Sequence, residues 1–326
     1  MAINVARRKF ITALCTAAAA WPWTAGAQSG TRRIGVLVVP DSPAYVPIFV
    51  ETLGKLGWIE GQNVHIEYRT SNADPESLRA AAADVVALRP DVIFAPGLSL
   101  VVARTQTQSL PIVFTQTTAP VERGFVASLA RPGGNVTGFT NFEPSIGGKW
   151  LGLLKEVAPK LARSATMFNP DGAPHAPFLL RSIEAASHTL AITTIAAPVR
   201  TDAEVETVLA SLAQDGDGAL VVIPDPFTIA HRQAIIRAAA SHRVPTIYSY
   251  RVFADDGGLM AYSADIPEQY RGAAEYVDRI LKGAKPGELP VQQPTKYQFV
   301  INLKTAKALG LTIPITLLAR VDEVIE

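Results

Sequence analysis

Hydroxyl, amide, carboxylate and aromatic side chains follow several apolar segments of this sequence. These residue types suit a small polar or zwitterionic ligand, because hydroxyls and backbone N–H groups bind a carboxylate, Asp171 or Asp225 pairs with an ammonium, and rings stack on an apolar group. The candidate ligand-binding residues are Asp41, Ser42, Tyr45, Gly97, Ser99, Gln116, Thr118, Phe142, Asn169, Asp171, Asp225, Tyr248 and Tyr250.

Each of these residues taken alone is also explained without a ligand. Ser, Thr, Asp and Asn after a strand are expected as helix N-caps. The ligand hypothesis depends on their convergence, because loops that follow parallel strands lie at one edge of a sheet, where helix N-termini present N–H groups.

Assembled catalytic motifs are absent from the sequence. Gly97-Leu98-Ser99-Leu100-Val101 lacks the second glycine of a nucleophile elbow, and there is no H-E-x-x-H, P-loop or G-x-G-x-x-G motif. No two of the five histidines are three or four residues apart, so no metal or cofactor is expected. An exported α/β hydrolase using Asp225 and His231 is a remote alternative.

The elements that position these loops alternate between strand and helix patterns, as in βαβ units with a parallel sheet. In the first half, strands are predicted at 34–39, 64–68, 92–95, 112–115 and 136–139, and helices at 45–56, 75–88, 98–108 and 121–129. In the second half, strands are predicted at 165–168, 192–196, 219–223, 246–248 and 297–302, and helices at 146–157, 176–190, 202–213, 227–241, 268–282 and 303–309.

This order predicts an α/β protein with two Rossmann-like lobes. Lobe 1 is predicted at 31–139 plus 264–290 and lobe 2 at 141–262 plus 294–326. Two connections between them are visible in the sequence, at 138–141 and at Val291-Gln292-Gln293-Pro294, where Gly, Pro and Gln are frequent.

Length and charge exclude several classes of partner. A chain of 326 residues suits two lobes, and 30 basic against 29 acidic residues leave no basic field for nucleic acid. After residue 27 no apolar stretch is long enough to span a bilayer.

Residues 1–27 have the features of an export signal. Arg7-Arg8-Lys9 precedes an apolar stretch, and Ala25-Gly26-Ala27 has the small residues of a cleavage site. The paired arginines are compatible with the twin-arginine route and with general secretion. Cleavage after Ala27 would place a cysteine-free protein with 27 basic and 29 acidic residues in the periplasm. A membrane anchor or a lipoprotein acylated at Cys15 fits less well, because Pro22 interrupts the apolar stretch and Leu14 precedes the cysteine.

Several segments carry a family resemblance. They are Leu56-Gly57-Trp58-Ile59-Glu60-Gly61-Gln62-Asn63-Val64, Pro90-Asp91-Val92-Ile93, the run from Phe125 to Gly138 and Pro290-Val291-Gln292-Gln293-Pro294-Thr295-Lys296. With these residues the chain resembles the extracytoplasmic solute-binding proteins of ABC importers, tryptophan/tyrosine type. The resemblance implies a type I periplasmic-binding fold with three crossover segments, and a monomer that delivers a small-molecule ligand to an inner-membrane permease and its cytoplasmic ATPase.

Two departures from the family pattern lie at the presumed pocket. The chain has Thr118-Ala119-Pro120-Val121 where the family often shows Ser-Asp-Pro-Val, and Pro96-Gly97 where Asn-Gly is frequent. A carboxylate that could face the ligand is therefore missing. A sensor that signals to a membrane receptor is the alternative to import that the sequence leaves open.

Overall fold

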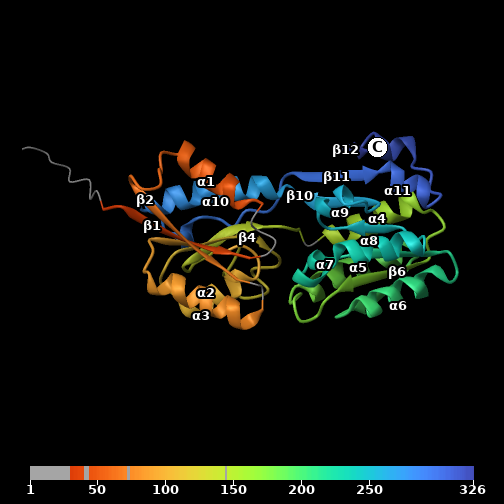
Figure 1. Ribbon diagram of the computed structural model, residues 1–326, viewed down its shortest axis with the longest axis horizontal. Helices are drawn as coiled ribbons and strands as arrows, with labels where there is room; N and C mark the ends of the chain where they lie inside the picture. Colours follow the sequence, from red (N-terminus) through yellow and green to blue (C-terminus); the bar gives the residue numbers. More distant parts are fainter. Residues whose placement is uncertain (1–29, 40–43, 72–73, 144) are drawn as a thin grey trace, which may run out of the picture. The chain divides into compact units, whose positions relative to one another are not determined.

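The computed structural model describes residues 30–326 apart from 40–43, 72–73 and 144. The predicted export signal at 1–27 and the candidate residues Asp41 and Ser42 lie outside the described residues. From Arg32 to Glu326 the chain forms one compact unit, which contains two sheets. We call the elements around the five-stranded sheet lobe 1 and those around the seven-stranded sheet lobe 2 (Figure 1).

Lobe 1 has a fully parallel sheet in the order β2-β1-β3-β4-β5. Its strands are β1 (Arg32–Val38), β2 (Val64–Thr70), β3 (Val92–Phe94), β4 (Ile112–Thr117) and β5 (Val136–Thr140). Its helices are α1 (Val46–Lys55), α2 (Pro75–Ala87), α3 (Ser99–Gln106) and, from far along the chain, α10 (Ile266–Leu281).

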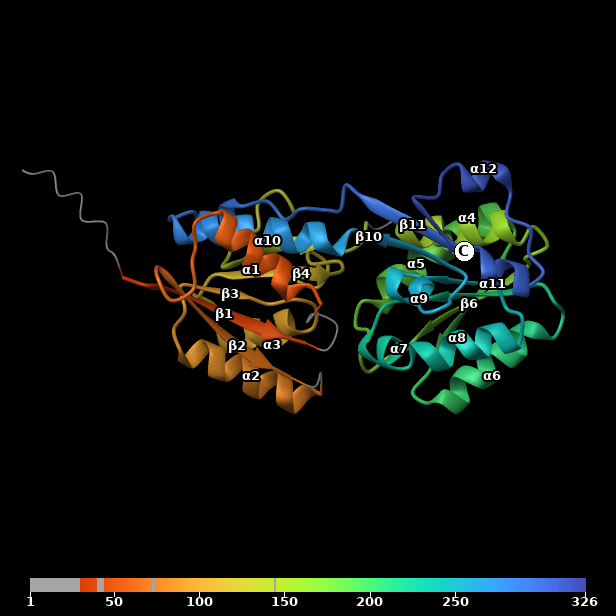
Figure 2. The ribbon, with the colours of Figure 1, turned by 45° about the horizontal axis from the view of Figure 1, so that its top comes forward.

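Both faces of the lobe 1 sheet are apolar, which is why helices cover both (Figure 2). Ile34 and Val36 of β1 pack in the cluster with α1 and α10, whereas Leu37 packs with α2 and α3. The alternation along β1 thus assigns neighbouring apolar residues to opposite cores.

Lobe 2 has a mixed sheet in the order β12-β11-β10-β9-β8-β6-β7, in which only the β10–β11 pair is antiparallel. Its strands are β6 (Arg163–Phe168), β7 (Thr193–Pro198), β8 (Gly218–Val222), β9 (Thr246–Tyr248), β10 (Met260–Ala264), β11 (Tyr297–Asn302) and β12 (Glu323–Ile325). Its helices are α4 (Ile146–Val157), α5 (Ala176–Leu190), α6 (Asp202–Ala213), α7 (Pro226–Ala230), α8 (Arg232–Ser241), α9 (Arg251–Asp255), α11 (Leu303–Ala308) and α12 (Ile315–Leu318).

Helix α10 belongs to lobe 1 although the strands on either side of it, β10 and β11, belong to lobe 2 (Figure 1). It begins at the N-cap Asp265, whose side chain accepts from Glu268 N. Its buried stripe contains Tyr270, Ala273 and Val277, at the spacing of one helix face. This return of the chain brings α10 against the ends of β4 and β5.

The segments that cross between the lobes are hydrogen-bonded to one another. Thr140 N donates to Gln292 O at 2.9 Å, and Gln292 N donates to Gly138 O at 2.9 Å. Asp265 N donates to Lys296 O at 3.2 Å. Three adjacent crossovers therefore join the lobes, as in the fold that the family resemblance implies.

The structure confirms the predicted strands to within a few residues and corrects part of the helix prediction. Residues 121–129 form turns rather than a helix, because Gly124 has φ +67° and both Phe125 N and Val126 N bond to Pro120 O. The predicted helix at 227–241 is divided at His231 into α7 and α8. Strands β10 and β12 and the short helices α9 and α12 were not predicted. Among the described residues, no helix is long and apolar enough to cross a membrane.

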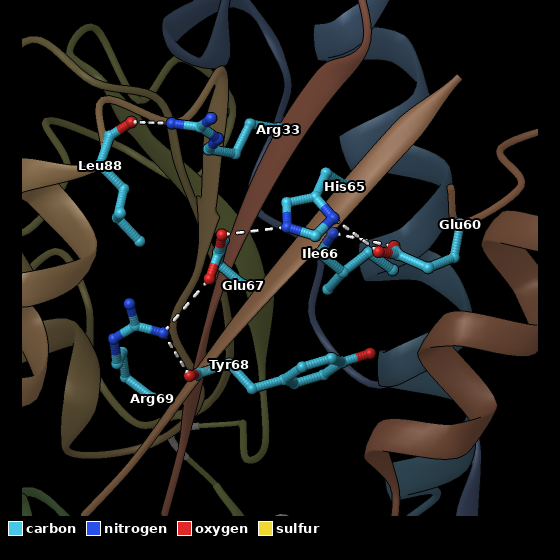
Figure 3. Close-up of polar contacts among 8 residues, drawn as sticks. All are labelled: Arg33, Glu60, His65, Ile66, Glu67, Tyr68, Arg69 and Leu88. Carbon is cyan, nitrogen blue, oxygen red and sulfur yellow. Dashed lines mark hydrogen bonds and ion pairs between the residues drawn. The ribbon is translucent and has the colours of Figure 1, made fainter. Parts of the chain in front are cut away.

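Strand β2 is the edge of the lobe 1 sheet and carries a network of charged side chains (Figure 3). His65 lies between Glu60 and Glu67, at 2.8 and 3.1 Å, and Arg69 pairs with Glu67 at 3.3 Å. The second oxygen of Glu60 accepts the backbone N–H of Ile66, a donor on the open side of the edge. Such charges and an occupied edge donor prevent pairing with a strand of another molecule.

The contact between α4 and α5 depends on a missing side chain. A Cβ at Gly147 would lie 2.9 Å from Ile183 N and 3.0 Å from Leu179 O, whereas a Cβ at Gly152 of the same helix has no neighbour within 4 Å. We expect Gly147→Ala to lower the free energy of unfolding by about 1–3 kcal/mol through overpacking. Gly152→Ala should raise it by about 0.5–1 kcal/mol through helix propensity. Urea unfolding of both variants checks this, and two variants that shift in the same direction would contradict it.

Candidate functional site

A cavity of about 190 Å³ is lined by residues of both lobes. Lobe 1 contributes Val39, Gly97, Leu98, Gln116, Thr118 and Arg123, and lobe 2 contributes Gly172, His175, Pro224, Asp225, Ile229 and Tyr250. Asn141, which follows β5 at the first crossover, also lines it. Because a single buried water needs about 10–15 Å³, the cavity has room for a small organic molecule.

Gln116, at the end of β4, has a left-handed backbone with φ +54°. Its N–H donates to Oε1 of Gln269 at 3.0 Å, and its own Oε1 accepts from the Tyr270 hydroxyl at 2.9 Å. Both partners are on α10, more than 150 residues away. Left-handed backbone is costly for a residue with a side chain and persists where neighbours hold it, so α10 sets the direction in which the chain leaves β4.

A short hydrogen-bond chain runs from lobe 1 to lobe 2 across the wall of the cavity. The Thr118 hydroxyl donates to Oδ1 of Asn141 at 2.8 Å, and Nδ2 of Asn141 donates to the Tyr250 hydroxyl at 3.4 Å. Thr118 and Asn141 are buried. These contacts connect the end of β4, the first crossover and the loop after β9.

Asp225 is the N-cap of α7 and is buried, with 4% of its surface exposed. One carboxylate oxygen accepts from Thr228 N and the other from Asn169 N, both at 2.8 Å. Burial raises the pKa of Asp225 to about 6, although the backbone hydrogen bonds oppose this. The pair of backbone donors ties the loop after β6 to the start of α7.

Three basic side chains, His175, Arg123 and Arg232, also line the wall. The Nε2 group of His175 donates to Pro224 O at 2.9 Å, and burial, with the nearby charge of Arg123, lowers the pKa of His175 to about 4. His175 is therefore neutral at pH 7. Arg123 stacks on the Phe125 ring at 4.6 Å, and Arg232 pairs with Asp256 at 2.6 Å.

Five of the candidate residues from the sequence lie together on the wall of this cavity. They are Gly97, Gln116, Thr118, Asp225 and Tyr250. They come from loops after four different strands, which are brought together at the ends of the two sheets. Their role in binding is a proposal.

The structure places the other described candidates away from this wall. Ser99 is buried and donates to Pro96 O at 2.6 Å, and Tyr248 is buried against Phe253. Tyr45 packs on the Tyr270 ring at 5.5 Å.

The remaining candidates have other neighbours. Phe142 is buried against Trp150 and lines a second cavity of about 290 Å³, which shares Thr118 with the first. Oδ1 of Asn169 accepts from Asp171 N, and Asp171 pairs with Arg200 at 2.8 Å on the surface.

Arg123, Asn141, His175 and Arg232 on the wall were not among the candidates. Asn141 and His175 had a local signal, because they lie at a predicted crossover and directly before α5. Arg123 had none, since it falls in the segment that the periodicity predicts as a helix.

The hydrolase alternative has no support in this geometry. His231 pairs with Asp202 at 2.7 Å and stacks on Phe227, while both oxygens of Asp225 accept backbone N–H groups. Within the described part of the chain, no group of three or more His, Cys, Asp or Glu side chains could hold a metal ion.

Comparison with known proteins finds a family model and a curated relative that match most of the chain. The family model described as "ABC transporter substrate binding protein" matches residues 34–325. A curated relative from Clostridioides difficile, called tyrosine-binding protein, is 27% identical over 86% of this chain and 81% of its own length.

Two solved structures are similar over nearly the whole chain. A conserved domain protein from Vibrio cholerae superposes with a TM-score of 0.83 at 27% identity, covering 90% of this chain and all of that one. An ABC domain in complex with L-Trp from Streptococcus pneumonia has a TM-score of 0.83 at 23% identity, covering 91% of this chain and all of that one. At that identity the second likeness concerns the fold alone.

The lowered pKa of His175 predicts a dependence of stability on pH. As the pH is lowered from about 6.5 to 4, the unfolded chain takes up a proton at this residue and the folded chain does not. The free energy of unfolding therefore decreases by about 1–3 kcal/mol over this range. We expect His175→Gln to lose less stability over this window than the wild type, and His188→Gln, an exposed change on α5, the helix that follows His175, to behave as the wild type.

Urea unfolding at pH 7.5, 6, 5 and 4 measures the difference. The raised pKa of Asp225 acts in the opposite direction, because the folded chain holds that proton from about pH 6 downward. Asp225 is present in all three proteins, so the comparison isolates His175. Equal losses in all three would contradict the prediction.

Proposed function

Because the chain belongs to the ABC transporter substrate binding protein family, we propose that it captures a small organic solute in the cavity between its lobes and delivers it to a membrane permease. The observation that carries the proposal is the composition of the wall. Polar groups from both lobes, Gln116 and Thr118 on one side and Asp225 and Tyr250 on the other, surround one cavity large enough for such a solute.

A ligand in this position contacts both lobes at once. It therefore stabilises the closed arrangement relative to an open one in which it touches one lobe, and it shifts the equilibrium by the difference in affinity. The three hydrogen-bonded crossovers are the segments that must bend. A permease that prefers the closed form would then receive the loaded protein.

The curated relative supports a solute of amino-acid size, because the Clostridioides difficile protein is named as tyrosine-binding. For this chain we propose a small polar or zwitterionic solute with an apolar part, because the wall also carries Leu98, Pro224 and Ile229.

Export to the periplasm is part of the same proposal. The features of residues 1–27 are those of a leader cleaved after Ala27. A binding protein that serves a permease must meet its solute outside the cytoplasmic membrane, so the leader and the proposed function agree.

The direct test is isothermal titration calorimetry on ligand-stripped protein with amino acids, short peptides, sugars and organic acids. We expect saturable binding of at least one member. A ligand at about 100 times its Kd adds about 2.7 kcal/mol to stability, so the thermal unfolding midpoint should rise with it. Absence of saturable binding across the panel would overturn the proposal.

Two tyrosines provide matched variants for the same assay. Tyr250→Phe removes a hydroxyl that accepts from Asn141 on the cavity wall but keeps the ring, and should weaken binding about 3- to 20-fold. Tyr68→Phe removes the hydroxyl of a tyrosine that is 43% exposed on β2, and should leave binding unchanged. Equal effects would place the site elsewhere.

A further inference from the structure

Arg123 is a cation on the cavity wall that has no carboxylate partner among the described residues. Its guanidinium stacks on the Phe125 ring at 4.6 Å, and burial lowers its pKa. The other arginine on the wall, Arg232, is neutralised by Asp256 at 2.6 Å. An arginine that is partly desolvated without a counter-ion is costly, and a bound anion would relieve that cost.

Three acceptors on the wall already accept hydrogen bonds within the protein. Oδ1 of Asn141 accepts from Thr118, Oε1 of Gln116 accepts from Tyr270, and Pro224 O accepts from His175. Gln116 lines the cavity, and its side chain also carries an Nε2 donor group. These three acceptors are therefore engaged within the protein, whereas the Arg123 guanidinium has no carboxylate partner among the described residues.

Asp225, the one carboxylate among the described residues of this wall, is a poor site for an ammonium group. It is 4% exposed, and each of its oxygens accepts a backbone N–H at 2.8 Å. Its raised pKa means that it is partly protonated at mildly acidic pH. Another acceptor on the wall, Nδ1 of His175, lies in the field of Arg123, which repels a second cation.

Much of the remaining wall is apolar. Val39, Leu98, Pro226, Ile229 and Ala230 all line the cavity. These side chains favour a ligand body of carbon and hydrogen over a sugar or a highly charged phosphate ester.

We propose that Arg123 is the counter-ion of a ligand carboxylate and that the ligand needs no ammonium group. The solute is then a small organic acid with an apolar body, bound through Arg123 and Nε2 of Gln116. This inference rests on the proposed function and specifies its class of substrate.

Two sets of probes, each an amino acid with its amine-free acid and its decarboxylated amine, test the ligand side by calorimetry. The first is L-tyrosine, 3-(4-hydroxyphenyl)propanoate and tyramine, and the second is L-leucine, 4-methylpentanoate and isoamylamine. We expect at least one amine-free acid to bind as tightly as its amino acid or more tightly, and both amines to bind more than about 10-fold more weakly than the acid. Phenyl phosphate is included to separate a carboxylate site from a phosphate site.

Substitutions test the protein side with the tightest-binding acid. Arg123→Gln should weaken binding about 10- to 100-fold, and Arg123→Lys, which keeps the charge, should recover part of the loss. Arg104→Gln is the matched control, because Arg104 stacks on the same Phe125 ring at 5.6 Å but does not line the cavity. Thermal unfolding of each free variant identifies any loss of folded protein.

Binding of amino acids without their amine-free acids would overturn this inference and leave the proposed function standing. Unchanged acid binding in Arg123→Gln, equal losses in Arg104→Gln, or tighter binding of phenyl phosphate than of the carboxylates would also overturn it. If neither acid binds, the inference fails, and the wider panel decides separately whether the protein binds a solute.

Discussion

The site depends on the contact between the end of β4 and α10. Gln116 keeps a left-handed backbone because Gln269 accepts its N–H and Tyr270 donates to its side chain. This turn directs the chain toward Thr118, whose hydroxyl reaches Asn141, and onward to the segment that carries Arg123. Helix α10 can make these contacts because the chain leaves the lobe 2 sheet after β10, crosses to lobe 1 and returns as β11. One helix therefore links the geometry of the cavity to the crossovers that join the lobes.

The charge balance of the cavity follows from which polar groups are already satisfied. The side-chain oxygens of Asp225, Oδ1 of Asn141 and the carbonyl oxygen of Pro224 accept hydrogen bonds from neighbouring loops. The guanidinium of Arg123 lies over the Phe125 ring and has no carboxylate partner among the described residues. Buried acceptors that are paired contribute rigidity, whereas a partly buried cation without a counter-ion attracts an anion. Residue types alone suggested a small polar or zwitterionic ligand, and these hydrogen bonds support our proposal of an anionic one.

The residues that carry the family resemblance lie mostly outside the cavity. In the run from Leu129 to Gly138, Leu129 O accepts from Val291 N, Gly133 N donates to Gly287 O, and the Thr137 hydroxyl donates to Leu289 O. A Cβ at Gly138 would collide with the backbone of Phe114 on β4. This run therefore attaches the third crossover to lobe 1. It identifies the family and the fold because its role is structural, and for the same reason it contains little information about the ligand.

The sequence by itself determined the alternation of strands and helices and most of their positions, because β-branched runs and helical periodicity are local patterns that packing here follows. It also indicated that loops after the strands hold polar groups, and five of the thirteen candidates lie on one wall.

Tertiary structure decided the rest. Residues 121–129 have a helical apolar period, yet Gly124 is left-handed and two backbone N–H groups bond to Pro120 O, so the segment forms turns that carry Arg123 to the cavity. Ser99 and Tyr248 follow strands as the binding hypothesis requires, but their side chains pack inward. Whether a carboxylate oxygen of Asp225 is available to a ligand depends on Asn169, which is 56 residues away in the sequence. The left-handed backbone conformation of Gln116 depends on a helix about 150 residues away. Contacts over such separations leave no periodic trace in the chain, so only the folded structure defines them.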